Sequence, residues 1–531
     1  MMRNLFASLA VAAILAGFAP AQETAVAPQA EPEQQSLADV ARAIKAKKRP
    51  EVVVNQDDAE QLFREVDSIL AFASESSELP KKTAVKYKLL GRDDVDKKFT
   101  AVLSTDDSTK RILHSELVLK KFGVLPDDFQ MQKYLTNKGG SDLAGFYDFR
   151  DKTMYLLNWI PLEQQRPVMA HELTHALQDQ NYDLLKWRNP LRSAKGDDDP
   201  LADDKGIETD ARIAATEGQA MLVYLDYEIR PMGMKLAEST DRFEVLKTRI
   251  LSAYDSPIKF HSAPLIFTEL ARFPYYDGFT FELEVLKQAG TRAAFAGVFA
   301  RPPRDTHEIM QPEAYLSETR PAPFSLPNLM PALGSGYVPY DSGSIGELDV
   351  RIMAKEFGRD NDAYSVAPFW NGGAYLAVRK PSASTKKDSE LTLADLAMTY
   401  VSRWKTAAAA ERFAELYKTA LLKRSKLFDA AASKGSHCDS NTPDCTARWR
   451  ARFDTDEGPV IMEISKDNTL MITQGLEDST VQQVKMAITR ENGATRASSE
   501  PELSLRFINL PAVQAMRQEI VNQITTRLGG K

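Results

Sequence analysis

The sequence of 531 residues lacks a charge excess of either sign, with 67 Lys and Arg against 74 Asp and Glu and a formal net charge of −7. It therefore gives no electrostatic reason to expect a nucleic acid or an anionic membrane as a partner. Beyond its N-terminus it also lacks an apolar run of the roughly 20 residues that a membrane-spanning helix needs. With 43% hydrophobic and 27% charged residues, the composition excludes a disordered chain, a collagen-like fibre and a membrane-embedded transporter.

Cysteine is scarce, since Cys438 and Cys445 are the only two in the chain. They flank the turn-forming sequence Asp-Ser-Asn-Thr-Pro-Asp, and an even pair in an exported protein most simply forms a disulfide. Closing so short a loop contributes about 2.5 kcal/mol in the chain-entropy model. We therefore expect the bond to hold one loop and not the whole fold. A metal site that also uses His437 is the alternative, but no fourth ligand lies nearby in the sequence.

The N-terminus, residues 1–21, is typical of a secretory signal peptide. Arg3 precedes an apolar stretch from Leu5 to Phe18, and Ala19-Pro20-Ala21 follows as a small-residue cleavage site. The apolar stretch is short for a membrane anchor, and no cysteine directly follows it for lipid attachment. Residues 22–38 combine Pro, Ala, Gln and Glu without periodicity and predict a disordered leader. We expect an exported protein, periplasmic or extracellular, without a stable membrane span after signal cleavage.

Helical and strand patterns follow along the rest of the chain. Helical spacing of apolar residues predicts helices over 57–73, about 109–122, 127–136, 207–228 and 241–253, and alternation predicts a strand over 83–90. A hairpin is expected over 145–157, because β-forming residues flank a polar turn. Strands are expected near 394–402 and 459–474, with a helix near 408–424 and further helices to the end. The pattern predicts an α+β fold with a mainly helical region over 39–380 and a C-terminal α+β region over 381–531.

An HExxH pattern runs from His171 to His175 on a predicted helix. Pro161 and Pro167 place the start of this helix, because proline is tolerated in a first turn and disfavoured in the interior. Residues i and i+4 share a helix face, so both imidazoles can bind one metal ion. Glu172 lies beside them and is placed to accept a proton from a bound water. A chance match on a helix without metal is the alternative.

A catalytic zinc site needs three protein ligands and an open position for water. Gln178 and Asn181 stand where a metzincin needs a glycine and a third histidine, which excludes that version. A glutamate on a later helix is then required. Glu217 is the best candidate, because a carboxylate on an apolar helix face is unfavourable unless it is paired or bound to metal. Gly218 beside it would let this helix and the HExxH helix approach closely. An ordinary surface or pairing glutamate is the alternative.

Several other residues are candidates for supporting roles. Glu208 and Asp210 lie about two turns before Glu217 and are the reserve ligands. Asp210 could also orient a ligating histidine through the second ring nitrogen. Stabilisation of the transition state needs a tyrosine, histidine or arginine further along the chain. His307, Tyr315 and Tyr375 are the candidates, with a purely structural role as the alternative for each.

A set of motifs marks the middle of the chain. They are AHELTHALQDQNYDL, ATEGQAMLVYLDY, FPYYDGFTF at 273–281, PPRDTHEIMQPEAY at 302–315, and IGELDVRIMAKEFG at 345–358 followed by FWNGGAYLAV. Over about 140–380 the chain resembles a family of exported bacterial HExxH zinc metallopeptidases of the gluzincin type. The resemblance implies zinc held by His171, His175 and Glu217, with Glu172 as general base. It also implies a zincin-like, mainly helical catalytic core with a small sheet before the HExxH helix.

The leading hypothesis is therefore an exported zinc metallopeptidase that hydrolyses peptide or protein substrates. Glu172 would take the proton of a water acidified by zinc and return it to the leaving amine. An edge strand of the 145–157 hairpin could pair with an extended peptide, since the hairpin leads directly into the HExxH helix. The main alternative is a zinc-stabilised, catalytically inactive binding or scaffold protein of the cell envelope. A zinc hydrolase of a non-peptide envelope substrate is a third hypothesis.

Overall fold

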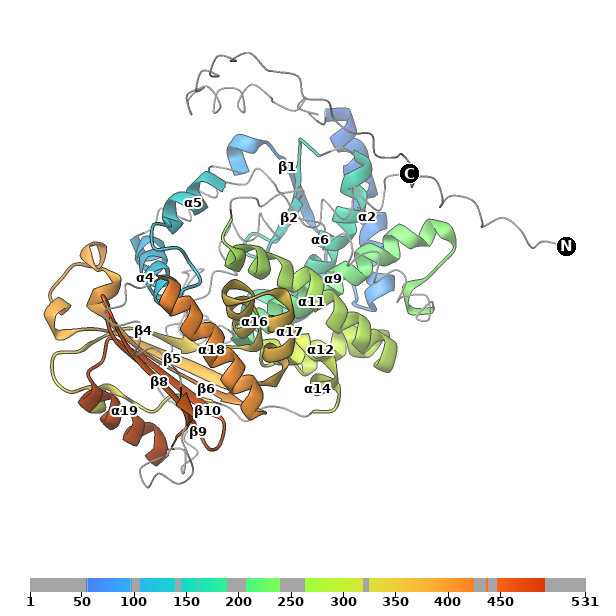
Figure 1. Ribbon diagram of the computed structural model, residues 1–531. Helices are drawn as coiled ribbons and strands as arrows, with labels where there is room; N and C mark the ends of the chain where they lie inside the picture. Colours follow the sequence, from blue (N-terminus) through green and yellow to red (C-terminus); the bar gives the residue numbers. More distant parts are fainter. Residues whose placement is uncertain are drawn as a thin grey trace, which may run out of the picture. The chain divides into compact units, whose positions relative to one another are not determined.

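The computed structural model (Figure 1) describes residues 54, 56–95, 97, 106–138, 145–160, 162–188, 207–238, 263–318, 324–424, 436–437 and 447–491. The predicted signal peptide, the leader, the Cys438–Cys445 disulfide and the helix expected at 241–253 lie outside these residues. The described part has the mixed α+β character predicted from the sequence. None of its helices combines the length and the apolar character that crossing a bilayer requires.

A small sheet precedes the HExxH helix, as the sequence predicts. Its three strands are β1 (Lys86–Leu90), β2 (Gly145–Asp148) and β3 (Thr153–Leu157), in the order β1-β3-β2. β2 and β3 form the expected antiparallel hairpin, and β1 pairs with β3 in parallel. β3 is buried along its whole length and is paired on both sides. Among the described strands of this sheet, the hairpin therefore offers a free edge only through β2.

Four helices pack together beside this sheet. They are α2 (Gln56–Ser77), α6 (Leu162–Tyr182), α9 (Ile207–Ile229) and α11 (Leu265–Ala289). α6 contacts both strands of the hairpin on one side and α2 and α9 on the other, and α9 also packs on α11. α9 is apolar or small on most of its circumference and is buried almost throughout, as expected for a helix enclosed by other elements. This packing places the HExxH segment of α6 in the interior.

The α9 and α11 helices cross at two glycines. A Cβ atom on Gly218 would lie 2.1 Å from the carbonyl oxygen of Gly278, and a Cβ on Gly278 would lie 2.1 Å from the carbonyl oxygen of Ala214. Neither position can therefore carry a side chain while the helices keep this separation. The close helix approach at Gly218 therefore occurs with α11, and not, as the sequence predicts, with the HExxH helix α6.

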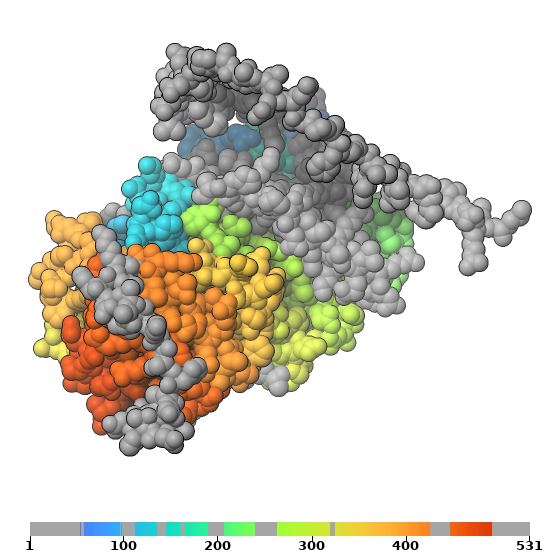
Figure 2. Space-filling view, in the orientation of Figure 1, coloured from blue at the N-terminus to red at the C-terminus, as the bar shows by residue number. Residues whose placement is uncertain are grey.

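A seven-stranded antiparallel sheet forms the second half of the described fold. Its strands are, in spatial order, β4 (Val338–Ser344), β5 (Trp370–Arg379), β6 (Leu396–Trp404), β10 (Thr469–Gln474), β9 (Gly458–Ser465), β8 (Ala447–Thr455) and β7 (Ser436–His437). One face packs against α18 (Ala407–Arg424), the orange helix that lies in front of the strands in Figure 1. The same orange part of the chain is visible on this side of the molecule in Figure 2. The other face packs against α15 (Met330–Leu333) and α19 (Asp478–Glu491). Both faces are thus covered, which explains why β6 and β10 are almost fully buried.

The domain boundary expected between 380 and 381 falls inside this sheet. β5 precedes it and β6 follows it, yet the two strands pair side by side, with Tyr375 opposite Tyr400. All described residues belong to one unit, Val52–Lys531. The strands and the helix expected between 394 and 474 are present, whereas the sequence pattern does not predict β4, β5, β7 and β8. The expected boundary therefore separates strands that share one hydrogen-bonded sheet.

Shorter or peripheral helices connect these layers. They are α4 (Asp106–Phe122), α5 (Met131–Lys138), α7 (Leu184–Arg188), the π-helical turn η4 (Ala293–Gly297), α12 (Val298–Ala300), α13 (Thr306–Met310), α14 (Pro312–Leu316), α16 (Glu347–Phe357) and α17 (Asp360–Val366). α7 follows the HExxH helix and contacts α9. η4 follows α11 and contacts it. Both segments supply groups to the site described next.

Candidate metal centre

Three buried side chains converge between α6 and α9. The Oε2 atom of Glu217 lies 3.2 Å from Nε2 of His171 and 3.1 Å from Nε2 of His175. The three residues are only 7%, 1% and 4% exposed, respectively. All three ligand atoms lie within 4.8 Å of one another, so the group could hold a metal ion. Within the described ranges it is the only group of three or more His, Cys, Asp or Glu side chains with this property.

The orientation of the His175 ring follows from Gln178, one turn along α6. The amide nitrogen of Gln178 donates to the backbone carbonyl of Thr216 at 3.0 Å and to Oε1 of Gln219 at 2.9 Å. The amide oxygen must then face His175 Nδ1, which lies 2.8 Å away and donates its proton. In the neutral form of the ring, the remaining nitrogen, Nε2, carries a lone pair and faces Glu217.

This tautomer shows whether the three side chains are suited to hold a metal ion. The lone pair of His175 Nε2 and the carboxylate oxygen of Glu217 are both acceptors, yet they face each other at 3.1 Å. Two buried acceptors repel at this distance unless a cation, either a proton or a metal ion, lies between them. The residues present therefore fit a metal ion bound through two imidazoles and one carboxylate.

A second layer of hydrogen bonds supports Gln178. The amide nitrogen of Gln219 donates to the carbonyl oxygens of Ala294 at 2.8 Å and Phe295 at 3.3 Å, both within η4. It also lies 3.4 Å from Oε1 of Glu282 on α11. Burial raises the pKa of Glu282 well above its usual range, against the lowering effect of the hydrogen bond from Gln219. A buried chain of amides thus connects the His175 ring to the end of α11.

Glu172 faces the small sheet and not the bulk solvent. Its Oε2 atom accepts the backbone N–H of Tyr147 on β2 at 2.9 Å. A Cβ on Gly145 would lie 3.2 Å from the carbonyl oxygen of Tyr155 and 3.9 Å from Cγ of Glu172, so β2 passes close to α6 here. Burial, the largest cause, raises the pKa of Glu172 to about 7, against the lowering effect of His171. The carboxylate expected to act as general base therefore lies against β2, the outer strand of the hairpin.

Glu217 is ionised despite its burial. Burial opposes ionisation, but His175, His171 and Arg188 outweigh it and hold the pKa of Glu217 well below its usual range. The guanidinium of Arg188 reaches the carboxylate from the C-terminal end of α7. A buried carboxylate that stays ionised beside two imidazoles supplies the negative charge that a divalent cation needs.

The resemblance to a metallopeptidase family rests on motifs of this sequence and stays a prediction. No protein-family model matches the chain, and no curated protein or solved structure does either. The described fold confirms the α+β class, whereas the zincin-like character of the core is still an expectation. The inference about function therefore depends on the geometry of the site itself.

Asp210 does not orient either of the two histidine rings, which is the supporting role expected for it. Asp210 is buried on α9, seven residues before Glu217 and thus about 10 Å away along the helix axis. The second ring nitrogen of His175 faces Gln178. That of His171 has no hydrogen-bond partner among the described residues. Neither ring is oriented by Asp210. The other reserve ligand, Glu208, pairs with Arg212 at 2.6 Å.

The residues expected to stabilise a transition state have contacts elsewhere. His307 on α13 faces the Glu347 carboxylate through Nδ1, and its Nε2 lies 3.2 Å from Lys405 Nζ. The Tyr315 hydroxyl donates to the carbonyl oxygen of Arg301 at 2.7 Å. None of these contacts involves the ligand group, so the structure favours a structural role for both residues.

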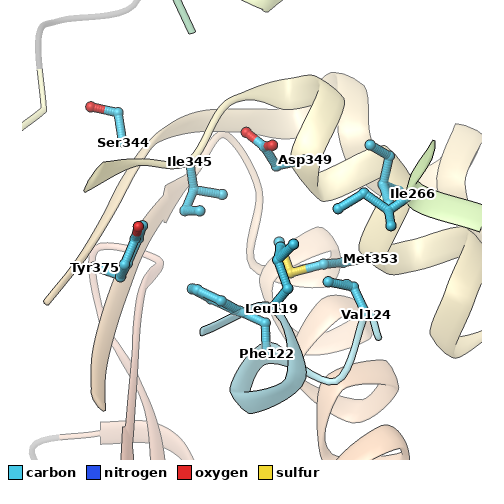
Figure 3. A pocket seen from close by; sticks show the side chains of 10 residues that line it. Leu119, Phe122, Val124, Ile266, Ser344, Ile345, Asp349, Met353 and Tyr375 are labelled. Atoms are coloured by element: carbon cyan, nitrogen blue, oxygen red, sulfur yellow. The ribbon is translucent and has the colours of Figure 1, made fainter. Parts of the chain in front are cut away.

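Tyr375 lines a separate apolar pocket, shown in Figure 3. Its hydroxyl donates to Asp341 Oδ2 at 3.2 Å. The pocket contains about 460 Å³ of space between atoms, part of it open to solvent, and its walls include Phe122, Ile266 and Met353 from α4, α11 and α16. Burial raises the pKa of Asp341 to about 8. Tyr375 thus belongs to the junction of α4, α16 and the large sheet.

Two aromatic residues near the ligands were not singled out from the sequence. The Tyr275 ring on α11 lies 6.1 Å from the His171 ring, measured between centroids. The Phe149 ring, at the turn of the hairpin, lies 6.2 Å from the His175 ring. Tyr275 lies within the FPYYDGFTF motif, and this motif is the feature of the sequence that could have pointed to it. Gln178 could have been found from its position three residues after His175, on the same helix face.

Proposed function

We propose that this chain is a zinc-dependent peptidase with His171, His175 and Glu217 as metal ligands and Glu172 as general base. The observation that carries the proposal is the buried convergence of two imidazole nitrogens and a carboxylate oxygen with a second carboxylate, Glu172, next to them. Two nitrogen donors and one oxygen donor suit zinc, and three protein ligands leave a fourth position open. When bound, zinc supplies a positive charge that polarises a carbonyl and acidifies water.

Glu172 has the properties that a general base requires. It is buried, and its raised pKa of about 7 lies near the operating pH at which proton transfer is most effective. It follows directly after the ligand His171, and the N–H of Tyr147 fixes one of its oxygens. The other oxygen is then available to take a proton from water and to pass it to a leaving amine.

A peptide is the substrate that best suits the edge of β2. The N–H of Tyr147 points away from β3, because it donates to Glu172. An extended peptide that pairs with this edge would run past the ligand group and would bring a backbone carbonyl towards it. We also propose that the protein is exported, as its first 21 residues indicate. Sequencing the N-terminus of the secreted or periplasmic protein would test this part.

The test compares bound zinc and cleavage of unstructured peptides for the wild type and Glu172→Gln. The wild type should bind about one zinc ion per chain and cleave peptides. The variant should keep the metal and lose activity by about 10²–10⁴-fold, the usual contribution of a general base. Glu65→Gln is the matched control. Glu65, on α2, pairs at 2.7 Å with Arg166, which lies on the same helix α6 as Glu172, and Glu65 has no role in the site. Undiminished cleavage by Glu172→Gln would refute the mechanism.

A second candidate function is a zinc-stabilised binding protein without catalysis. The deep burial of the three ligands supports it, because a buried ligand group also contributes to folding when it binds metal. In that case the wild type binds zinc but cleaves no peptide, and His171→Ala mainly lowers the thermal stability. The same measurements therefore distinguish the two candidates.

A further inference from the structure

The two carboxylate oxygens of Glu217 face different partners. Oε2 lies 3.2 and 3.1 Å from the Nε2 atoms of His171 and His175. Oε1 lies 3.2 Å from Nη2 of Arg188. The carboxylate is thus already oriented, with one oxygen directed at the candidate metal position and the other at a guanidinium.

Arg188 is itself held in place from two sides. Its Nη2 atom also donates to the Thr216 hydroxyl at 2.6 Å. Its Cζ atom lies 4.8 Å from the centroid of the Phe149 ring, in a cation–π contact. The side chain is 12% exposed, so little of it is free to move into solvent. The guanidinium is therefore a fixed partner of Glu217.

Carboxylates bind metal ions through one oxygen or through both. Coordination through both oxygens of Glu217 would bring the protein donors of a zinc ion to four and, with a bound water, the total number of donors to five. Coordination through Oε2 alone leaves three protein donors and, with a bound water in the open position, a total of four, the arrangement typical of a catalytic site. Whatever holds Oε1 away from the metal thus decides whether the fourth position is open to water or taken by Oε1.

We infer that Arg188 is a positioning residue that restricts Glu217 to binding metal through Oε2 alone, and so keeps the fourth position open. The inference rests on the proposed metal site. The positive charge of Arg188 near a divalent cation lowers metal affinity by repulsion. A residue that served only to strengthen metal binding would not be a cation. Arg188 therefore acts on the number of donor atoms around the metal. Its removal should change the metal coordination more than the metal affinity.

The experiment uses Co²⁺ in place of zinc in the full chain. Four-coordinate Co²⁺ absorbs visible light more strongly than five-coordinate Co²⁺, so the spectrum reports the number of donors. With Arg188→Met, both oxygens of Glu217 become available, and we expect a loss of intensity in the visible bands relative to the wild type. Metal affinity, measured by chelator competition, should change by less than tenfold. Arg188→Lys keeps a cation that can donate to Oε1 and should restore the wild-type spectrum.

Thr216→Val provides a second variant if Arg188→Met does not fold. It removes one of the two polar partners of Nη2 without changing the charge, and it should shift the spectrum in the same direction as Arg188→Met. A wild-type spectrum for both variants, with Co²⁺ bound, would overturn the inference and leave the proposed function intact. No uptake of Co²⁺ or zinc by the wild type would overturn both.

Discussion

Replacing Gly218 by alanine tests whether the close crossing of α9 and α11 sets the position of Glu217. The new Cβ would lie 2.1 Å from the carbonyl oxygen of Gly278 and 2.9 Å from Cγ of Glu282. Both distances are shorter than 3.0 Å, the shortest contact that Cβ atoms make in real structures. Both obstacles belong to α11, and the nearer one is rigid backbone. The two helices must therefore separate by about 1 Å, and overpacking of this kind lowers the free energy of unfolding by about 1–3 kcal/mol.

The same displacement reaches the metal ligands, because Glu217 directly precedes Gly218. A shift of about 1 Å moves its carboxylate out of register with the two imidazoles on α6. Supporting changes around metal ligands typically weaken metal binding by about 10–100-fold, and we expect an effect in this range. Urea denaturation of the metal-free protein measures the packing effect, and competition with a chromophoric chelator measures the effect on zinc binding.

Gly91→Ala is the matched control, because its Cβ would meet nothing closer than Asn158 Nδ2 at 3.6 Å. This variant should stay within about 0.5 kcal/mol of the wild type. Gly278→Ala should destabilise the protein as Gly218→Ala does. The double variant should cost less than the sum, since one helix separation relieves both clashes. Wild-type stability and zinc affinity in Gly218→Ala would refute the reasoning.

Three further predictions follow from the contacts of single side chains. Tyr275→Phe should lower kcat for peptide cleavage by about tenfold or more at unchanged KM if its hydroxyl stabilises the transition state, and an unchanged kcat would exclude this role. Gln178→Leu leaves His175 Nδ1 without an acceptor and should weaken zinc binding by about 10–100-fold, whereas unchanged chelator competition would show that the amide does not orient the ring. For Asp341, whose pKa rises from 3.8 unfolded to about 8 folded, the folded state binds the extra proton, so stability falls as pH rises between these values. Relative to Asp341→Asn, the wild-type free energy of unfolding should fall by up to about 1.4 kcal/mol per pH unit, and parallel curves for the two proteins would contradict this.

The candidate ligands could be predicted because the relevant physics is local. With about 3.6 residues per turn, His171 and His175 lie on one face wherever that segment is helical. The unfavourable burial of a carboxylate then singles out Glu217 on its own helix. Both arguments depend on residues within a few positions of each other. The structure confirms the convergence of the three side chains.

The residues that surround the ligands could not be predicted in this way. Arg188 and Tyr275 come from α7 and α11, and their positions depend on how those helices pack on α6 and α9. A guanidinium at the end of a short helix gives no periodic signal. Its role appears only once Thr216 and Phe149 are placed beside it.

The extent of the large sheet was missed for a different reason. β4 and β5 carry residues that weaken a strand pattern, namely Pro339 and Gly343 in β4 and Gly372 in β5. Gly372 has a φ of 113°, and the register between β5 and β6 shifts between Trp370 and Gly373. A bulge of this kind breaks the alternation on which strand prediction depends. The alternating strand pattern is therefore interrupted in β5, the strand that pairs with β6 across the expected boundary at residue 380.

The position of β10 in the large sheet has a consequence for how the chain is made. β10 is the last strand of the described sequence, yet it lies in the middle of the sheet, between β6 and β9. Until residues 469–474 leave the ribosome, β6 and β9 each keep an unpaired edge that can pair with another chain. The two halves of this sheet can therefore join only after β10 has been synthesised. A product that ends before residue 469 would carry two open half-sheets, and we expect it to aggregate or to be degraded.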